Sequence, residues 1–283
     1  MVSTRSTKRR SRSPAAEVDS DPRPGKAPRK SEKLVQEPEQ EPDQPSKTVK
    51  VVLLDIEGTI CPITFVKDTL FPYALKALPD VLATKWDDPA FTPYRNAFPE
   101  SASSSPEALE AHVKDLTERD VKIAYLKNLQ GYLWEDGYKS HAYSTPIYPD
   151  VLAALDQWSK SMEVVIYSSG SIFAQKLLFQ HIKDPASSDD PEAVLDRRDD
   201  IKAWFDTTNA GLKHDASSYE NIAQDLEQDP KEILFLSDNV KEVRAAIEAG
   251  MVSKVVDRPG NPPLLDADRK ELEVVESFEQ LGL

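Results

Sequence analysis

Four short, mostly apolar runs constrain this fold more than any other feature of the sequence. They cover residues 49–54, 163–167, 232–236 and 253–256, and they end at Asp55, Ser168, Ser237-Asp238 and Asp257. Runs of this length with little alternation of polar and apolar residues are typical of strands buried on both faces of a parallel sheet.

A helical pattern accompanies each of these strands. Helices are expected over 151–160, 172–182, 217–226 and 240–249, and Gly250 is suited to end the last one. Strands that alternate with helices of this length imply βαβ units. The sequence therefore predicts an α/β fold with a doubly wound parallel sheet.

The alternation stops between about residues 65 and 145. Helices are expected there over 71–82, 106–117 and 117–129, with no strand between them. We therefore predict an α/β core formed by 47–66 and 146–283, with a helical cap inserted at 67–145. The segment 184–200 is acidic and poor in apolar residues, so we expect a surface loop.

Residues 1–46 are predicted to be a disordered tail. They are rich in Ser, Pro and charged residues and have too few apolar side chains to offset the entropy of ordering. Two basic clusters, within 8–10 and 26–30, indicate either a solvated charged segment or a nuclear-import signal.

The composition disfavours several classes of partner. The net charge of −14 argues against binding of nucleic acid by the folded part. No stretch approaches the roughly 20 uninterrupted apolar residues that a membrane span needs. Cys61 is the single cysteine, which rules out an internal disulfide and fits a reducing compartment. We expect a soluble, monomeric, cytoplasmic protein that acts on a small molecule, and a nuclear location stays open.

The carboxyl end of the first strand carries Asp55-Ile56-Glu57-Gly58-Thr59. Asp55 and Glu57 can both face one crevice once the backbone turns at Gly58, and Thr59 adds a hydroxyl suited to a phosphate. Ligands of open α/β sheets bind outside the carboxyl ends of the strands. Because the motif is short, a structural turn with incidental acids explains it equally well on its own.

Two further strand ends carry groups suited to a phosphate and a metal ion. Ser168 and Ser169 precede a helix, where hydroxyls and free backbone N–H groups suit a dianion. Asp238 ends another strand with Glu242 one helical turn later, and hard oxygen ligands suit Mg²⁺. Taken singly, helix capping explains the serines, and a capping acid with a surface glutamate explains the carboxylates.

Lys213 precedes the helix expected at 217–226. A lysine in this place is usually solvated. A carboxylate that attacks a phosphate needs a nearby cation, however, because the two anions repel each other. The four motifs lie at the same edge of the predicted sheet and together supply a nucleophile, a phosphate clamp, a cation and metal ligands. Their combination indicates a phosphatase.

The order of these motifs resembles the haloacid dehalogenase-like phosphatases. That family usually has two aspartates in its first motif, whereas Glu57 takes the second place here. This departure is similar to the enolase-phosphatases of methionine salvage, also called acireductone synthases. The similarity extends over the segments 63–66, 167–171 and 175–179, Lys213, Ser218-Tyr219 and 235–238.

The resemblance implies a bifunctional reaction on a phosphorylated diketone, 2,3-diketo-5-methylthiopentyl-1-phosphate. The substrate would first be enolised and then lose its phosphate to give an acireductone. Two alternatives stay open. One is a related phosphatase for another small ester such as a sugar phosphate, and the other is a scaffold without catalysis whose basic tail reaches a nuclear partner.

The same resemblance implies a role for each site residue. Asp55 would attack phosphorus and form an aspartyl-phosphate, and Glu57 would act as the acid and base. One Mg²⁺ per subunit would be held by Asp55, the Glu57 carbonyl and Asp238. The phosphate would be bound by Ser168, Ser169 and Lys213. Glu57 is also a candidate for the base that enolises the substrate, an assignment that the sequence leaves open.

Overall fold

The computed structural model describes residues 49–187, 190 and 192–283, and every feature below belongs to these residues. The tail predicted over 1–46 lies outside them.

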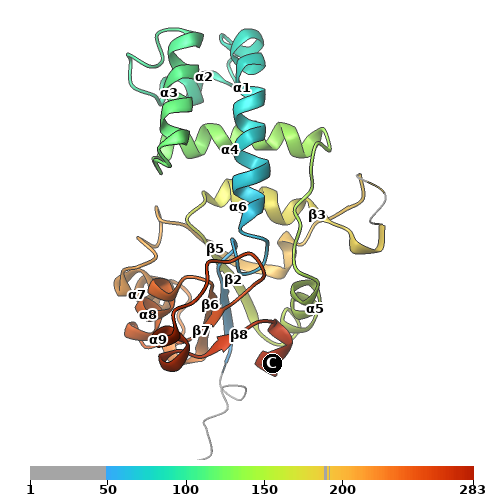
Figure 1. The fold of residues 1–283 in the computed structure, drawn as a ribbon, viewed down its shortest axis with the longest axis vertical. Helices are drawn as coiled ribbons and strands as arrows, with labels where there is room; N and C mark the ends of the chain where they lie inside the picture. Colours follow the sequence, from blue (N-terminus) through green and yellow to red (C-terminus); the bar gives the residue numbers. More distant parts are fainter. Residues whose placement is uncertain (1–48, 188–189, 191) are drawn as a thin grey trace, which may run out of the picture. The chain divides into compact units, whose positions relative to one another are not determined.

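Six parallel strands form one sheet in the order β5-β2-β1-β6-β7-β8 (Figure 1). Their bounds are β1 Val51–Leu54, β2 Glu163–Tyr167, β5 Ile201–Phe205, β6 Ile233–Ser237, β7 Val252–Val256 and β8 Val274–Val275. The four strands expected from the sequence are β1, β2, β6 and β7. β2 and β5 lie on one side of β1, and β6, β7 and β8 lie on the other side. The direction in which successive strands are added therefore reverses beside β1, and open α/β sheets bind ligands at such a point.

Both faces of the central strands are buried, which explains why their sequences are continuous apolar runs. In β1, Val52 and Leu54 belong to one hydrophobic cluster, whereas Val51 and Leu53 belong to another on the opposite face. Successive side chains of a strand point to opposite faces, so a strand covered on both sides needs apolar residues at every position.

Helices cover the two faces of the sheet. Residues of α5 (Pro149–Trp158) and α6 (Ile172–Gln180) belong to the first cluster. Residues of α7 (Ala216–Asp225) and α8 (Val240–Glu248) belong to the second. A short α9 (Asp266–Glu271) lies between β7 and β8. The predicted doubly wound α/β fold is confirmed, and so are the helices expected at these four places.

The segment between β1 and β2 is helical, as expected. A π-helical turn, η2 (Val66–Leu70), leads into α1 (Phe71–Lys85), followed by α2 (Thr92–Asn96), α3 (Pro106–Glu118) and α4 (Ala124–Lys139). Their apolar side chains continue the cluster on the α5–α6 face of the sheet. The boundaries drawn for the cap at 67 and 145 stay a prediction.

The helix expected over 117–129 is wrong in its placement. The chain leaves α3 after Glu118, and Asp120 has a left-handed backbone with φ of 50°. Such a conformation cannot continue a right-handed helix. The next helix, α4, begins at Ala124 and extends to Lys139.

The segment expected to be a loop over 184–200 contains little regular structure. Its strand β4 (Val194–Leu195) pairs with β3 (Ile182–Lys183), and the short 3₁₀ turns are η3 (Pro185–Ser187) and η4 (Arg198–Asp200). Two further 3₁₀ turns are η5 (Pro230–Glu232) and η6 (Phe278–Leu281).

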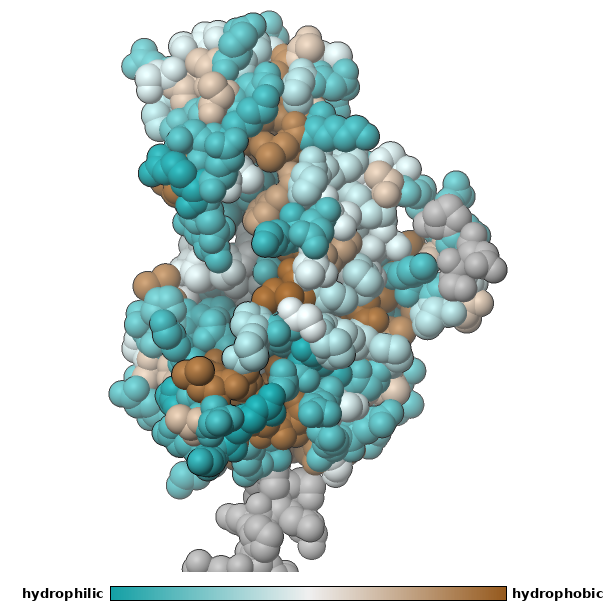
Figure 2. All heavy atoms as spheres, in the orientation of Figure 1, coloured by the Kyte–Doolittle hydropathy of each residue, from teal (hydrophilic) through white to brown (hydrophobic). Residues whose placement is uncertain are grey.

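Hydrophilic side chains cover most of the face drawn in Figure 2, and apolar ones form small separate patches. Within the described residues, no helix combines the length and the apolar character that crossing a membrane requires.

Candidate active site

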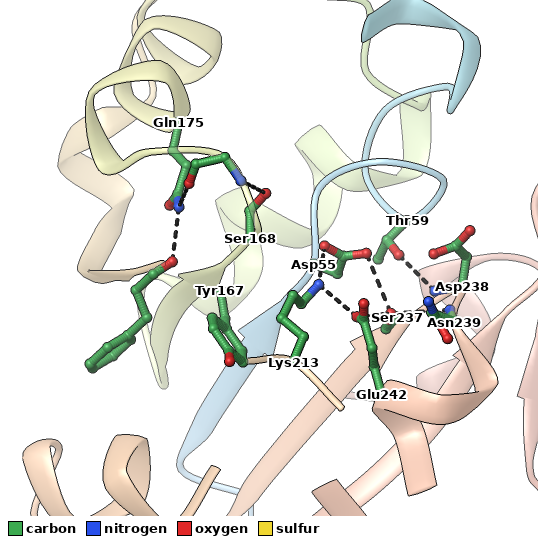
Figure 3. Close-up of polar contacts among 12 residues, drawn as sticks. Asp55, Thr59, Tyr167, Ser168, Gln175, Lys213, Ser237, Asp238, Asn239 and Glu242 are labelled. Carbon is green, nitrogen blue, oxygen red and sulfur yellow. Dashed lines mark hydrogen bonds and ion pairs between the residues drawn. The ribbon is translucent and has the colours of Figure 1, made fainter. Parts of the chain in front are cut away.

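Lys213 joins two carboxylates beyond the carboxyl ends of β1 and β6 (Figure 3). Its Nζ lies 2.5 Å from Asp55 Oδ1 and 2.6 Å from Glu242 Oε2. The Ser237 hydroxyl lies 2.9 Å from Glu242 Oε2 and 3.3 Å from Asp55 Oδ2. Asp55 and Lys213 are almost fully buried. The predicted nucleophile and the predicted cation are thus brought into direct contact.

The charge of Lys213 is fixed by its two partners. Burial alone lowers the pKa of an ammonium, but Asp55 and Glu242 together raise the pKa of Lys213 well above its usual value. Helix α7 holds this lysine in place, because its Tyr219 donates a hydrogen bond to the Lys213 carbonyl at 2.7 Å. A cation that cannot lose its proton is suited to offset negative charge on Asp55.

The loop after β1 is braced against the loops after β6 and β7. The backbone N–H of Asp238 donates to Thr59 Oγ1 at 3.0 Å, and Asn261 Nδ2 donates to the Gly58 carbonyl at 2.8 Å. Gly58 has φ of 71°, and a Cβ on it would fall 2.6 Å from Asp238 Oδ2. Only glycine fits this close approach. Thr59 is fully buried and its hydroxyl accepts the bond of this brace, and the phosphate contact expected from the sequence stays a prediction.

The Asp238 carboxyl lies in an environment that favours a bound cation. Burial and then repulsion from Asp55 raise the pKa of Asp238 to about 8. Within the described residues, no three His, Cys, Asp or Glu side chains form a ready-made metal cage. Mg²⁺ keeps several waters and takes only one or two protein carboxylates, so Asp55 and Asp238 with a backbone carbonyl fit it chemically.

The serines after β2 form a tight loop ahead of α6. Gly170 N–H donates to Ser168 Oγ at 3.2 Å, and Ala174 N–H donates to Ser171 Oγ at 3.3 Å. Ser171 is thus the residue that caps the helix, which leaves Ser168 and Ser169 available for another role. Gln175 stabilises the loop by donating to the Gly170 and Phe205 carbonyls, each at 2.8 Å.

A cavity of about 550 Å³ opens beside these serines. Glu57, Ser168 and Ser169 line it, whereas the Asp55–Lys213 pair adjoins it through Glu57, two residues from Asp55. Burial and then the charge of Asp55 raise the pKa of Glu57 to about 7. A carboxyl whose pKa lies near neutrality is suited both to give and to take a proton.

Most of the cavity wall comes from the inserted helices and is apolar. It includes Val66, Leu70, Phe71, Leu116, Val121, Leu126 and Trp134 of the inserted segment, and Leu178 of α6 adds to it. The Trp134 indole N–H is already used, because it donates to the Leu70 carbonyl at 2.8 Å. This region is therefore suited to an apolar part of a ligand.

Sequence reasoning missed two polar residues of the site, Lys127 and Gln130, and gave a third, Glu242, a different neighbour. Glu242 was considered beside Asp238, but it contacts Lys213. Lys127 and Gln130 line the cavity from α4, about 40 residues before the serine loop that they face. Only their spacing of three residues on a helix indicates a shared face, and nothing local points to the sheet edge.

Comparison with known proteins gives consistent matches. The sequence model of the haloacid dehalogenase-like hydrolases matches residues 49–250. Proteins named Enolase-phosphatase E1 are similar: the one from Neurospora crassa is 54% identical over 237 residues, 83% of this chain and 98% of that protein. The one from Podospora anserina is 55% identical over 82% of this chain and 97% of that protein. The crystal structure of the UTR4 protein from Saccharomyces cerevisiae superposes with a TM-score of 0.73 at 38% identity, covering 82% and 99% of the two chains.

Proposed function

The chain belongs to the haloacid dehalogenase-like hydrolases and, within them, to the enolase-phosphatases, and from this membership we propose that it converts 2,3-diketo-5-methylthiopentyl-1-phosphate into an acireductone and phosphate. It is a phosphatase of methionine salvage. The substrate identity, the metal and the role of each residue are parts of the proposal.

The proposal rests on one observation, namely that a single cavity combines a polar surface with an apolar one. The polar edge of the sheet, with Glu57, Ser168 and Ser169, opens directly onto a wall formed by apolar side chains of the inserted helices. A methylthio-alkyl chain attached to a phosphate needs both surfaces, whereas a sugar phosphate would leave its hydroxyls against apolar groups at a cost. The volume lies within the range of small-ligand sites.

Phosphoryl transfer begins with Asp55. One carboxylate oxygen attacks phosphorus, the bond from phosphorus to the substrate oxygen breaks, and Glu57 protonates the leaving oxygen. Water activated by the Glu57 carboxylate then cleaves the aspartyl-phosphate. Ser168 and Ser169 hold the phosphate oxygens, and Lys213 offsets the charge that accumulates beside Asp55.

Mg²⁺ fits this arrangement as the cofactor. Asp55, Asp238 and the Glu57 carbonyl would hold it, and when bound it neutralises charge on the phosphate. The proximity of Gly58 to Asp238 brings the backbone of the first loop beside the carboxylate of the second, as a shared ion requires.

Enolisation precedes this transfer. A base removes a proton from the carbon that carries the phosphate ester, and the adjacent carbonyl becomes an enolate. Glu57 is the base in this proposal because it lines the cavity beside the phosphate loop. The proton that Glu57 takes from carbon is then available for the leaving oxygen, so one carboxyl serves both half-reactions.

The test measures both half-reactions in one sample. The full chain is mixed with the diketo phosphate and Mg²⁺, and enol absorbance and free phosphate are followed together. We expect both to grow, with the enol first. Release of phosphate from sugar phosphates at a comparable kcat/KM, without enolisation of the diketone, would favour the alternative phosphatase. Absence of phosphate release from every ester, aryl phosphates included, would favour the scaffold.

A further inference from the structure

Enolisation needs a group that the residues assigned so far do not supply. When the proton leaves carbon, negative charge develops on the neighbouring carbonyl oxygen, and a hydrogen-bond donor aimed at that oxygen lowers the barrier. Lys213 is not suited to be that donor, because two of its three N–H groups already contact Asp55 and Glu242 and because it does not line the cavity. The donor must lie on the cavity side of the serine loop.

Three lysines line the cavity, and they differ in burial. Lys67 and Lys122 are exposed, and Lys122 lies 4.0 Å from its neighbour Asp120. Lys127 is half-buried, and its Nζ donates to the Ser169 carbonyl at 2.7 Å. This contact holds the ammonium beside the residues proposed to bind the phosphate. An ammonium has three N–H groups, so two remain for a ligand.

Gln130 is an independent sign of a polar ligand at the same place. Its side chain is one turn from Lys127 on α4, is only 6% exposed and lines the cavity. Its amide is not among the enclosed polar atoms that lack a partner, so it faces the cavity. An amide N–H2 in this position is available to donate to a polar group of a ligand.

We propose that the turn of α4 that carries Lys127 and Gln130 binds the two adjacent carbonyl oxygens of the substrate, with Lys127 as a catalytic residue of the enolisation. This inference rests on the proposed function and assigns a donor to each oxygen. Lys127 faces the carbonyl next to the phosphate ester, because it is bonded to Ser169. Gln130, further along α4, donates to the second carbonyl.

Enolisation transfers protons and electron pairs between the substrate, Glu57 and Lys127. The C–H bond of the ester carbon breaks, and its proton passes to the Glu57 carboxylate. The bonding electrons form a carbon–carbon double bond, and the carbonyl π electrons move to oxygen. The Lys127 ammonium stabilises this oxygen and gives it a proton, and water restores the proton to Lys127. Burial, and then the neighbouring Lys122, lower the pKa of Lys127, which eases this transfer.

A purely structural role for Lys127 makes a different prediction. If its bond to the Ser169 carbonyl only positions the phosphate loop, its loss harms every reaction of the phosphate. If it stabilises the enolate, its loss harms only substrates that must be enolised. An aryl phosphate such as p-nitrophenyl phosphate has no proton to remove and reports phosphoryl transfer alone.

The experiment compares Lys127→Met, Lys127→Arg, Gln130→Met and Lys139→Met in the full chain with Mg²⁺. Each is assayed for deuterium exchange at the enolised carbon of the diketo phosphate and for hydrolysis of p-nitrophenyl phosphate. For Lys127→Met we expect exchange to fall by about 10²–10³-fold, with aryl phosphate hydrolysis within about threefold of the parent. Lys127→Arg keeps the charge and should recover part of the exchange. Gln130→Met should mainly raise KM for the diketone, by about 3–10-fold.

Lys139→Met is the matched control, since Lys139 lies on the same helix α4 but is exposed and outside the cavity lining, and it should leave both reactions near the parent rates. An equal loss of both activities in Lys127→Met, or no loss of exchange, overturns the assignment. Melting temperatures identify any variant that is merely misfolded, in which case Lys127→Arg decides between charge and position. If the parent hydrolyses the aryl phosphate but does not enolise the diketone, the proposed function fails, and this inference fails with it.

Discussion

At the scale of single residues, one buried ammonium organises the reactive carboxylates. Lys213 contacts Asp55 and Glu242 at once, and neither the lysine nor Asp55 is appreciably exposed. A buried charge without a partner is costly, so each of these groups depends on the others. The arrangement leaves Asp55 Oδ2 without a cationic partner among the described residues, on the side where Ser237 is the neighbour.

Replacing the nucleophile separates the two half-reactions. Asp55→Asn keeps the shape of the side chain but removes the attacking carboxylate, so phosphate release from the diketo phosphate should fall by at least ~10⁴-fold, about 5 kcal/mol of barrier. Removal of a proton from carbon does not need Asp55, so deuterium exchange should persist, slowed by a weaker metal site. Phosphate assays and exchange measured by NMR check this. Phosphate release at the parent rate would contradict an aspartyl-phosphate.

At the scale of elements, α4 is both a wall of the cavity and a close neighbour of the chain that follows it. Gly137 lies inside this helix, and a Cβ on it would fall 2.5 Å from the Tyr143 hydroxyl oxygen. Tyr143 is fixed in turn, since it donates to the Trp134 carbonyl at 3.0 Å and packs edge-to-face on Tyr73. The absence of a side chain at 137 therefore allows the helix and the following segment to pack closely.

Gly137→Ala should destabilise the protein despite the better helix propensity of alanine. The propensity gain is about 1 kcal/mol, whereas overpacking against the fixed Tyr143 ring costs typically 1–3 kcal/mol. Gly131→Ala is the matched control on the same helix, because its nearest neighbour is the Phe173 ring at 3.1 Å, which is 43% exposed and free to move. Urea unfolding should therefore rank Gly131→Ala above Gly137→Ala in stability. Equal stability of the two variants would show that the Tyr143 packing yields.

At the scale of the whole molecule, an ion pair ties the C-terminal segment to α5 and to the catalytic loop. Arg258 Nη1 lies 2.9 Å from Asp150 Oδ2, and Arg258 Nε donates to the Thr59 carbonyl at 3.0 Å. The Phe278 N–H donates to the same Asp150 oxygen at 2.7 Å. Burial alone raises the pKa of Asp150, but Arg258 and these donors together lower it below its usual value.

The sign of that shift predicts how acid affects folding. Because the pKa of Asp150 is lower in the folded than in the unfolded state, its contribution to stability is present above the unfolded pKa of about 3.9 and is lost as pH falls through the folded pKa. Asp150→Asn should cost about 3 kcal/mol at pH 7 by leaving Arg258 buried and unpaired. The difference from the parent should shrink in urea titrations near pH 3. Asp156→Asn, whose pair with Arg197 is largely exposed on the aspartate side, should cost less than about 1 kcal/mol. A cost for Asp150→Asn that is the same at both pH values would contradict the linkage.

Removing residues 1–46 should leave catalysis unchanged. The match to the Neurospora crassa protein accounts for 98% of that protein with 83% of this chain, so a part of this chain has no counterpart there. We expect kcat/KM and the melting temperature of the shortened chain to equal those of the parent. The location of the tagged full chain and the tagged shortened chain in cells tests the basic clusters separately. If 1–46 contain an import signal, the nuclear fraction of the protein should disappear when these residues are removed.

The sequence predicts the elements that are buried on both sides and misses those at the sheet edges. β1, β2 and β6 are recognisable because nearly every position is apolar, and β7 keeps three valines among its five residues. β5 is an edge strand in which Lys202 is exposed and Ala203 and Trp204 are only half-buried, so its pattern carries no continuous signal. β8 has two residues, too few for any period.

The residues of the candidate site also divide into those that the sequence predicts and those that it misses. Asp55, Ser168 and Asp238 each follow a recognisable strand, so sheet topology alone brings them together. Lys127 and Gln130 depend on how the inserted helices pack over the sheet edge, which no local pattern encodes. The contact between Lys213 and Glu242 is likewise a tertiary pairing, between the loop before α7 and the first turn of α8.

The insertion of helices between β1 and β2 has a consequence for synthesis of the protein on the ribosome. Among the described residues β1 pairs with β2 and β6, which begin about 110 and about 180 residues later in the chain, so at roughly 5–20 residues per second β1 waits at least about 6 s for these partners. During that interval its four apolar residues, all buried in the native sheet, have no strand to pair with. The inserted helices are complete before β2 emerges and are the first partners available to cover it. A nascent chain arrested near residue 150 should therefore bind chaperones through the segment that later positions the nucleophile.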